Sequence, residues 1–327
     1  MTTPTSKSPA PPFSEAAGIP VNDPTPVSTF SPLVLAVSGR TVDLQLKVSA
    51  PATGTDLPVI LLSHGHGPAN FASSLYGYDP LAHFWAAHGL AVIQPTHLDA
   101  TMLGLSEADD REAPLYWRSR PQDMSYIIDR LDEIEASVPG LAGRLDARRI
   151  AAVGHSLGGH TVAMLCGQRA TDPADGAEVD LRDDRVKAGV LMAPPGNGDD
   201  LAAFAREHYP VLATTHFATM TTPALVIAGD KDQNPRFSDR EDWRADAYYL
   251  SPGPKSLLTI FGGEHSLGGV AMWDSATTDE NPERVAAVRA LTWAYLRTTL
   301  YPGDSALPDA IAALESQPDP LGKVESK

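Results

Sequence analysis

Cysteine is almost absent from this chain, and so are long apolar runs. Its 327 residues include a single cysteine, Cys166, so no disulfide can form within the chain, and folding does not depend on an oxidising compartment. Cys166 lies in the apolar stretch TVAMLCG, which favours a small buried side chain over a reactive thiol. Because no run of about 18 apolar residues occurs, we expect no membrane span.

Positive charge is also scarce, since 25 lysines and arginines stand against 41 aspartates and glutamates, for a formal net charge of −16. An acidic surface repels nucleic acid and anionic membranes at long range, so we expect neither as a partner. The N-terminal residues are rich in proline, serine and threonine, and they lack the continuous apolar run of a secretion signal. These features predict a flexible arm over residues 1–27 and a cytoplasmic protein, and they leave the oligomeric state open.

Beyond the arm, short apolar segments alternate with segments of helical periodicity. FSPLVLAVSG and TVDLQLKVSAP predict an opening antiparallel hairpin. Six nearly continuous apolar runs predict strands covered on both faces: PVILLSHG, LAVIQPTH, RIAAVGHS, AGVLMAPP, PALVIAGD and SLLTIFGG. Apolar spacing of three and four predicts helices over residues 79–89, 121–138, 157–170 and 282–300.

This alternation predicts an α/β fold with a mostly parallel central sheet, right-handed crossovers and helices on both faces. We expect a single domain over residues 28–302 and a loosely attached tail over residues 303–327. The segments 209–222 and 233–254 fit the sheet poorly and are candidates for pocket walls. Whether the first of them acts as a lid is left open.

The pentapeptide HSLGG occurs twice in the chain. Only Ser156, in the first copy, has glycine two residues away on both sides, because Ser266 in the second copy has Glu264 on one side. A serine on a sharp strand-to-helix turn needs both glycines, since a side chain there would crowd the turn and the neighbouring strand. The first copy therefore predicts a nucleophile, Ser156, and the second predicts a base, His265.

The candidate residues all follow predicted strands. In open α/β sheets ligands bind at the carboxyl ends of the strands, so we expect Ser156, His265 and the intervening aspartates to converge there. A serine hydroxyl attacks well only when a base removes its proton, and the base works best when a carboxylate fixes its tautomer. In the segment GDKDQNP either Asp232 or Asp230 could supply that carboxylate. Glu264 is less suitable, because the side chain adjacent to His265 would point elsewhere.

The order Ser, Asp, His, with a G-x-S-x-G turn between a strand and a helix, resembles the α/β-hydrolase superfamily over roughly residues 28 to 300. The stretches GHSLGGHT and HGHGPANFASSLYGYDPLAHFWAAHGLAVIQPTH are similar to the branch that includes chlorophyllase-like and polyester- or lipid-ester-cleaving serine hydrolases. Leu157 stands where chlorophyllases carry arginine, which argues against chlorophyll as the substrate. Ser156 stands where dienelactone hydrolases use cysteine. The resemblance implies the α/β-hydrolase fold with a small cap or none, and no cofactor.

The resemblance also implies roles for individual residues. Asp232 stands where the family's acid usually lies, and His265, alone among the ten histidines, follows both the last strand and the acid. The oxyanion hole is expected from the backbone N–H groups of Leu157 and of His66, which follows H-G in the segment SHGHG. His64 and His66 lack an acidic or cysteine partner at a recognisable spacing, so no metal is expected.

Aromatic residues near the predicted site favour a small-molecule or lipid-like ester with an apolar acyl or aryl group as the substrate. The expected substrate-binding residues are Tyr76, Trp117, Trp243 and Trp273. The sequence thus predicts a carboxylic ester hydrolase that works through an acyl-enzyme. Hydrolysis of an amide, lactone or carbon–carbon bond by the same triad remains an alternative, as does a non-catalytic ligand receptor on the same fold.

Overall fold

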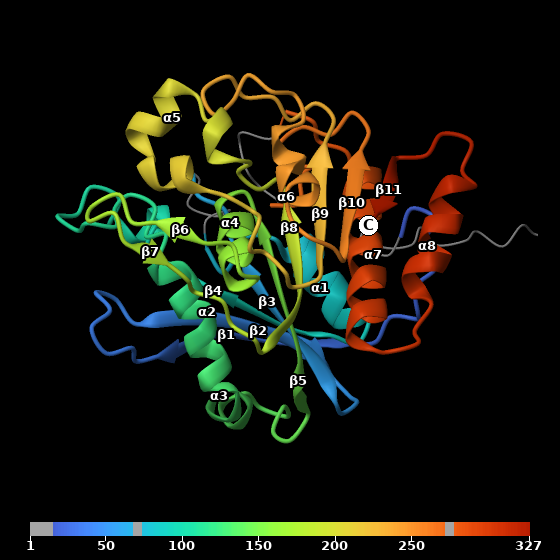
Figure 1. Cartoon of the computed structure of the whole chain (residues 1–327). Helices are drawn as coiled ribbons and strands as arrows, with labels where there is room; N and C mark the ends of the chain where they lie inside the picture. Colours follow the sequence, from blue (N-terminus) through green and yellow to red (C-terminus); the bar gives the residue numbers. More distant parts are fainter. Residues whose placement is uncertain (1–15, 68–73, 272–277) are drawn as a thin grey trace, which may run out of the picture.

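The computed structural model describes residues 16–67, 74–271 and 278–327. In these residues a nine-stranded sheet forms the centre of the molecule, in the order β1-β2-β4-β3-β5-β8-β9-β10-β11 (Figure 1). Its strands are β1 (Val27–Leu35), β2 (Leu44–Pro51), β3 (Leu57–Ser63), β4 (Ala91–Pro95), β5 (Leu145–His155), β8 (Val186–Met192), β9 (Ala224–Gly229), β10 (Lys255–Ile260) and β11 (Gly322–Ser326). A separate two-stranded ribbon consists of β6 (Ala170–Thr171) and β7 (Glu178–Val179).

The connections between the strands contain the helices. These are α1 (Asp79–Ala87), α2 (Ser119–Asp129), α3 (Leu131–Ser137), α4 (Leu157–Leu165), α5 (Ala203–His208), α6 (Asp246–Tyr249), α7 (Pro282–Leu300) and α8 (Ala306–Glu315). Short 3-10 turns are η1 (Thr101–Leu103), η2 (Gly198–Asp200), η3 (Pro210–Thr214) and η4 (Trp243–Ala245).

Six neighbouring strands, from β4 through β3, β5, β8 and β9 to β10, run parallel to one another. Strands β1 and β2 pair antiparallel, and β2 also runs antiparallel to β4. Strands β3 and β9 are buried at every position, as parallel strands covered on both faces must be. The predicted α/β class, the mostly parallel sheet and the opening antiparallel hairpin are therefore confirmed.

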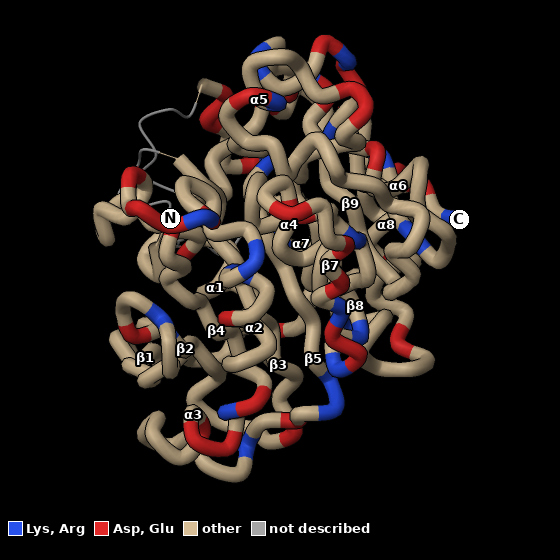
Figure 2. The backbone as a smooth tube through the Cα atoms, turned by 60° about the vertical axis from the view of Figure 1, so that its left-hand side comes forward, with Lys and Arg blue, Asp and Glu red and all other residues tan. Residues whose placement is uncertain are grey.

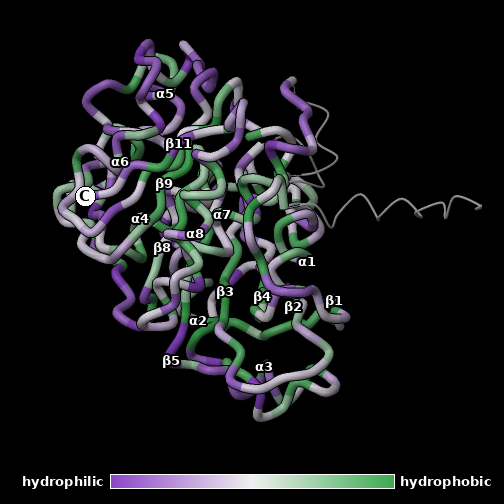
Figure 3. Tube along the Cα trace, turned by 90° about the vertical axis from the view of Figure 1, so that its right-hand side faces the viewer, coloured by the Kyte–Doolittle hydropathy of each residue, from purple (hydrophilic) through white to green (hydrophobic). Residues whose placement is uncertain are grey.

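Two apolar cores lie on opposite faces of the sheet, because side chains alternate along each strand. From β3, Ile60 and Leu62 join the core formed with α1, α7 and α8, whereas Val59 and Leu61 join the core formed with α2, α3 and α4. Figure 3 shows the central strands coloured as hydrophobic and the loops around α5 as largely hydrophilic. Helices thus cover both faces, as the sequence predicts.

The end of the chain is not a loosely attached tail, so that prediction is wrong. Helix α8 buries Ala310 and Leu314 in the core next to α7, and β11 pairs antiparallel with β10. The segment that forms β11, GKVES, is short and mostly polar because an edge strand can leave much of its surface exposed. Its strand character comes from the partner β10 rather than from its own composition.

Part of the predicted arm also packs against the domain. Ile19 is 4% exposed and belongs to the core that includes α7 and α8. Gln317 donates a side-chain hydrogen bond to the Ala17 carbonyl at 2.7 Å, and the Thr25 N–H donates to the Ala87 carbonyl at 2.8 Å. Residues 1–15 lie outside the described residues.

Positions of positively and negatively charged residues are interspersed along the described chain (Figure 2). Ion pairs join segments that are distant in the sequence, for example Arg185 with Asp129 at 2.5 Å and Arg240 with Asp200 at 2.7 Å. Over the ranges that the structure describes, no helix is both long enough and apolar enough to cross a membrane.

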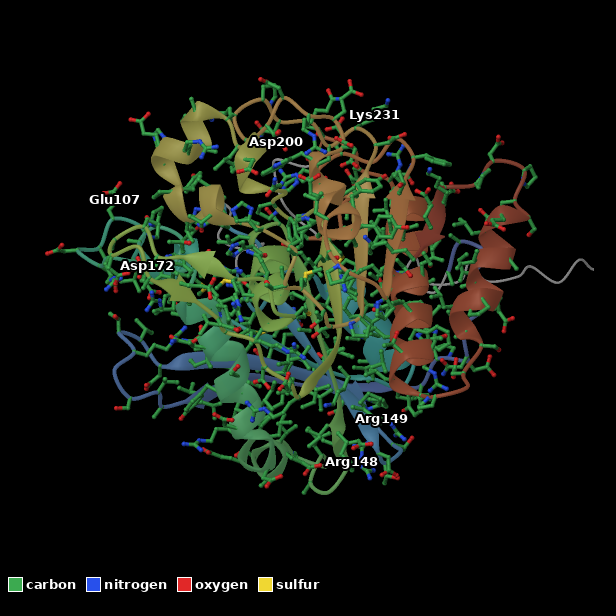
Figure 4. All side chains as sticks on the ribbon, in the orientation of Figure 1. Glu107, Arg148, Arg149, Asp172, Asp200 and Lys231 are labelled. Atoms are coloured by element: carbon green, nitrogen blue, oxygen red, sulfur yellow. The ribbon has the colours of Figure 1, made fainter. Side chains whose placement is uncertain are left out.

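The carboxyl ends of the parallel strands gather at one end of the molecule. Figure 4 shows Lys231, which closely follows β9, and Asp200 at this end, whereas Arg148 and Arg149 near the start of β5 lie at the opposite end. Helix α5 lies above the carboxyl ends in Figure 1. This end of the sheet is therefore where the candidate residues meet.

Candidate active site

Ser156 occupies a strained turn between β5 and α4. Its backbone has φ 56° and ψ −119°, outside the regions that residues with a side chain normally adopt. A Cβ at Gly154 would collide with the Gly158 carbonyl, and a Cβ at Gly158 would collide with the Ser63 carbonyl on β3. Both glycines of G-x-S-x-G are therefore required by close approach of the backbone.

The second HSLGG copy adopts a different structure. It lies in a loop after β10, where the Ser266 hydroxyl donates to Asp279 and positive φ falls on Leu267 rather than on the serine. Glu264 Oε2 accepts a hydrogen bond from the Thr278 hydroxyl. Identical pentapeptides thus fold differently because their flanking residues and neighbours differ.

A continuous hydrogen-bonded chain joins Ser156, His265 and Asp232. The Ser156 Oγ lies 2.9 Å from His265 Nε2, and His265 Nδ1 lies 2.8 Å from Asp232 Oδ2. The carboxylate can only accept, so His265 Nδ1 carries the proton and Nε2 is free to accept the proton of the serine hydroxyl. Asp230 is exposed and accepts from the Gly262 N–H at 2.6 Å. The structure therefore brings together the three residues preferred from the sequence and directs Asp230 away.

The sequence does not point to Arg244, which is a further partner of the acid. Its side chain is 7% exposed, and its Nε lies 3.2 Å from Asp232 Oδ2. Burial by itself would raise the pKa of Asp232, but the Arg244 charge, followed by His265, outweighs it and lowers the pKa to about 2. Asp232 is consequently a carboxylate at neutral pH and can orient the imidazole.

The two backbone donors expected near Ser156 come from different elements. Leu157 is the first residue of α4, so its N–H has no partner within the helix. The loop after β3 approaches from the other side, since a Cβ on Gly65 would lie 3.4 Å from the Ser156 Cβ. His66, the next residue, is held by its side chain, whose Nδ1 lies 3.0 Å from Asp99 Oδ2. Buried Arg120 pairs with the same carboxylate.

A second Ser–His–Asp chain occurs beneath the first. Ser63 Oγ lies 2.9 Å from His97 Nε2, and His97 Nδ1 lies 2.9 Å from Asp123 Oδ2. Ser63 and His97 are 0% exposed, and Arg40 pairs with Asp123 at 3.0 Å. No substrate can reach this serine, so the chain is a buried polar network that ties β3 to α2. Both chains have the same order of Ser, His and Asp hydrogen bonds, so they differ in whether the serine is accessible.

The aromatic residues expected to bind substrate are placed unequally. Trp117 and Trp243 are 5% and 3% exposed and belong to one apolar cluster with Leu157, the residue after Ser156. Tyr76 is 39% exposed. Trp273 lies outside the described residues, so the structure does not address it.

Two aromatic residues that the sequence did not single out complete a wall beside the site. The Tyr209 ring lies edge-on to the His66 ring at 6.2 Å and stacks parallel to Phe237 at 5.9 Å. Phe237 in turn lies 6.4 Å from the Trp243 ring. The wall therefore runs from His66, in the loop after β3, to Trp243, the residue before Arg244. Tyr209 and Trp117 also line a cavity of about 220 Å³.

His64 and His66 are held apart by separate hydrogen bonds. His64 Nδ1 lies 2.7 Å from the Gly65 carbonyl, and its Nε2 accepts from the His97 N–H at 3.0 Å. Within the ranges described, no group of three or more histidine, cysteine or acidic side chains is arranged to hold a metal ion.

No protein-family model matches this chain, and no curated protein matches it significantly. The class of protein must therefore be argued from the geometry of the site.

Proposed function

We propose that this protein is a serine hydrolase of the α/β-hydrolase fold that cleaves carboxylic esters with an apolar acyl or aryl group. The observation that carries the proposal is the hydrogen-bonded chain Ser156–His265–Asp232 at the carboxyl end of a parallel sheet. The three residues follow one another in the order Ser, Asp, His, which is the order of α/β hydrolases. The strained serine between β5 and α4 fits the nucleophile turn of that fold.

In the proposed reaction His265 Nε2 removes the proton from Ser156 Oγ as the oxygen attacks the ester carbonyl carbon. The tetrahedral intermediate collapses when His265 returns this proton to the leaving alcohol, which leaves an acyl group on Ser156. Water then loses a proton to His265 as it attacks the acyl-enzyme, and His265 returns this proton to Ser156 Oγ as the acid is released. Asp232 stays ionised throughout and stabilises the imidazolium.

The negative charge of the intermediate needs donors that are already in place. The N–H of Leu157 at the start of α4 and the N–H of His66 supply them in this proposal. The Asp99 contact of His66 and the ion pair between Asp99 and Arg120 hold the loop that carries the His66 N–H.

The aromatic wall supports an apolar or aryl ester as the substrate. Tyr209 and Phe237 are partly exposed, and their stacked rings offer flat apolar surface between the oxyanion loop and the acid loop. Such faces bind apolar and aromatic groups through buried area and ring stacking.

The test is hydrolysis of p-nitrophenyl esters from acetate to palmitate by wild type and by Ser156→Ala. Because the serine supplies the attacking oxygen, we expect the variant to lose roughly 10³-fold or more of kcat. The matched control is Ser266→Ala, which changes the serine of the other HSLGG copy and should retain turnover. A p-nitroanilide of the best acyl group tests amide cleavage by the same residues.

Equal turnover by wild type and Ser156→Ala would refute the proposal. Stoichiometric retention of one ligand without turnover would favour the receptor alternative instead. The chain-length profile of an active wild type would measure the depth of the acyl site.

A further inference from the structure

A buried chain of hydrogen bonds joins the oxyanion loop to the backbone of the base. The Gly65 N–H donates to Tyr78 Oη at 3.1 Å, and Tyr78 Oη lies 2.9 Å from His155 Nδ1. His155 Nε2 lies 2.7 Å from the carbonyl oxygen of His265. The chain thus begins beside the donor loop and ends on the residue that carries the base.

The positions of the protons follow from the partners. The His265 carbonyl only accepts, so His155 Nε2 must carry a proton and donate it. In a neutral imidazole Nδ1 is then an acceptor, and the Tyr78 hydroxyl donates to it. The same hydroxyl oxygen accepts from the Gly65 N–H. Every bond in the chain therefore has one donor and one acceptor, with a single direction from Gly65 to His265.

The surroundings keep this arrangement fixed. Tyr78 is 2% and His155 5% exposed. Burial, followed by the nearby His265, lowers the pKa of His155 to about 3, so the ring stays neutral and keeps this tautomer at neutral pH. The His155 ring lies 5.0 Å from the His265 ring. Both His155 nitrogens are nevertheless hydrogen-bonded elsewhere, to the Tyr78 hydroxyl and to the His265 carbonyl oxygen.

Tyr78 also holds a backbone conformation that costs free energy. It precedes α1 with φ 63° and ψ 17°, the left-handed region that a residue with a side chain seldom adopts. A Cβ at Gly65 would lie 3.1 Å from Tyr78 Oη and 3.4 Å from the His155 carbonyl. The glycine therefore lets the loop pack closely on the hydroxyl.

We propose that Tyr78 and His155 are positioning residues that fix the loop Gly65–His66 and the base His265 in place relative to Ser156. This inference rests on the proposed function, because these positions matter for catalysis only if His66 donates to the oxyanion and His265 moves the proton. Neither residue touches the reacting atoms. Their effect is to couple two loops that lie far apart in the sequence and must act on the same atoms.

The first variant to test is Tyr78→Phe, which keeps the ring and removes the hydroxyl. The Gly65 N–H then loses its acceptor and His155 Nδ1 loses its donor, so both loops are released from each other. Displacing a donor or base from its reactive position costs roughly 10- to 100-fold in rate. We expect kcat on the best p-nitrophenyl ester to fall by about this factor while KM changes little.

The matched control is Tyr116→Phe. Tyr116 is also 2% exposed, also has positive φ, and donates its hydroxyl to a backbone carbonyl, that of Leu105 at 2.9 Å. Both variants should lower the thermal midpoint by similar amounts, because each loses a buried hydroxyl. Only Tyr78→Phe should lower kcat. Equal kcat losses in the two variants, or a wild-type kcat in Tyr78→Phe, would overturn the inference.

A second pair of variants tests the other end of the chain. His155→Gln keeps an N–H that can donate to the His265 carbonyl, whereas His155→Leu has no donor. We expect kcat of the glutamine variant to exceed that of the leucine variant by several-fold at matched stability. The double variant Tyr78→Phe/His155→Leu should be hardly slower than the slower single variant, because both changes break one chain. If the kcat losses of the two single variants multiply in the double variant, the two residues do not act through one chain.

The rate at which a fluorophosphonate labels Ser156 distinguishes failure of this inference from failure of the proposed function. This reagent requires an activated serine but no knowledge of the substrate. A wild type that is not labelled and cleaves no ester refutes the proposed function and the inference with it. A labelled wild type with an equally fast Tyr78→Phe variant refutes the inference alone.

Discussion

At the scale of single residues, the direction in which a side chain leaves its loop decides what it can do. Asp230 and Asp232 lie two residues apart after β9. The first caps the Gly262 N–H at the surface, while the second is 5% exposed between His265 and Arg244. Only the second can therefore fix the tautomer of His265 and balance its charge.

The two aspartates provide a matched pair of substitutions. Asp232→Asn should lower kcat by roughly 10³- to 10⁴-fold, because an amide can favour the wrong imidazole tautomer and carries no charge. Asp230→Asn should leave kcat near the wild-type value. Ester hydrolysis by both variants under the same conditions measures the difference. Equal damage in the two variants would contradict the assignment of the acid.

At the scale of elements, the close approach of α4 to β3 and β5 explains why the turn contains glycines. The start of α4 contacts the end of β3 so closely that Gly158 has no room for a side chain. The same contact aims the N-terminus of α4, where the Leu157 N–H has no acceptor within the helix, toward the end of the sheet. Packing between elements thus creates the donor at Leu157.

The C-terminal elements give a stability prediction. Leu314 on α8 is 1% exposed in the core, so Leu314→Ala should reduce the free energy of unfolding by about 2–5 kcal/mol. Urea unfolding of purified variants measures this loss. Leu250→Ala is the control, since Leu250 is 47% exposed and its truncation should change little. A stability unchanged by Leu314→Ala would mean that α8 is not docked in solution.

At the scale of the whole molecule, several histidines are buried in neutral form. Burial is the largest cause that lowers the pKa of each of them, to about 3 for His155 and about 4 for His160, and well below the ordinary value for His64 and His97. In the unfolded chain a histidine titrates near 6.5. Below that pH the unfolded state binds more protons than the native state, so stability must fall as the pH falls.

Between pH 7 and pH 5 a histidine that stays neutral in the native state should remove about 2 kcal/mol from the free energy of unfolding. Asp123 acts in the opposite direction, because burial raises its pKa to about 6 and the native state takes up that proton first. The net loss is expected to be several kcal/mol. Urea titrations at pH 7, 6 and 5 measure it.

His160→Leu serves as the comparison for this pH dependence. Both ring nitrogens of His160 are buried without a hydrogen-bond partner in the described part of the chain. Its replacement should therefore reduce the slope of the unfolding free energy with pH. At pH 5 the reduction corresponds to close to one bound proton per molecule. A wild-type stability that is flat from pH 7 to pH 5 would show that the buried histidines do not remain neutral.

The sequence by itself determined the elements of the core and the turn at Ser156. Apolar periodicity is a local property, so β3, β9 and α7 could be predicted close to their bounds. Helix α4 ends at Leu165, five residues before the predicted end, and β5 begins at Leu145, four residues before the predicted start. The glycines around Ser156 are also local, since they relieve crowding within a few residues. In contrast, β11 and the docked residues near Ile19 were mispredicted, because partners distant in the sequence hold them in place.

Only the tertiary structure decided which polar residues act together. It separated Asp232 from Asp230, added Arg244, and joined Tyr78 and His155 into one chain. It also distinguished two Ser–His–Asp chains by burying Ser63 and leaving Ser156 partly exposed. The physical reason is that exposure and side-chain direction depend on packing between distant segments, whereas strand and helix formation depends largely on the local pattern of apolar residues.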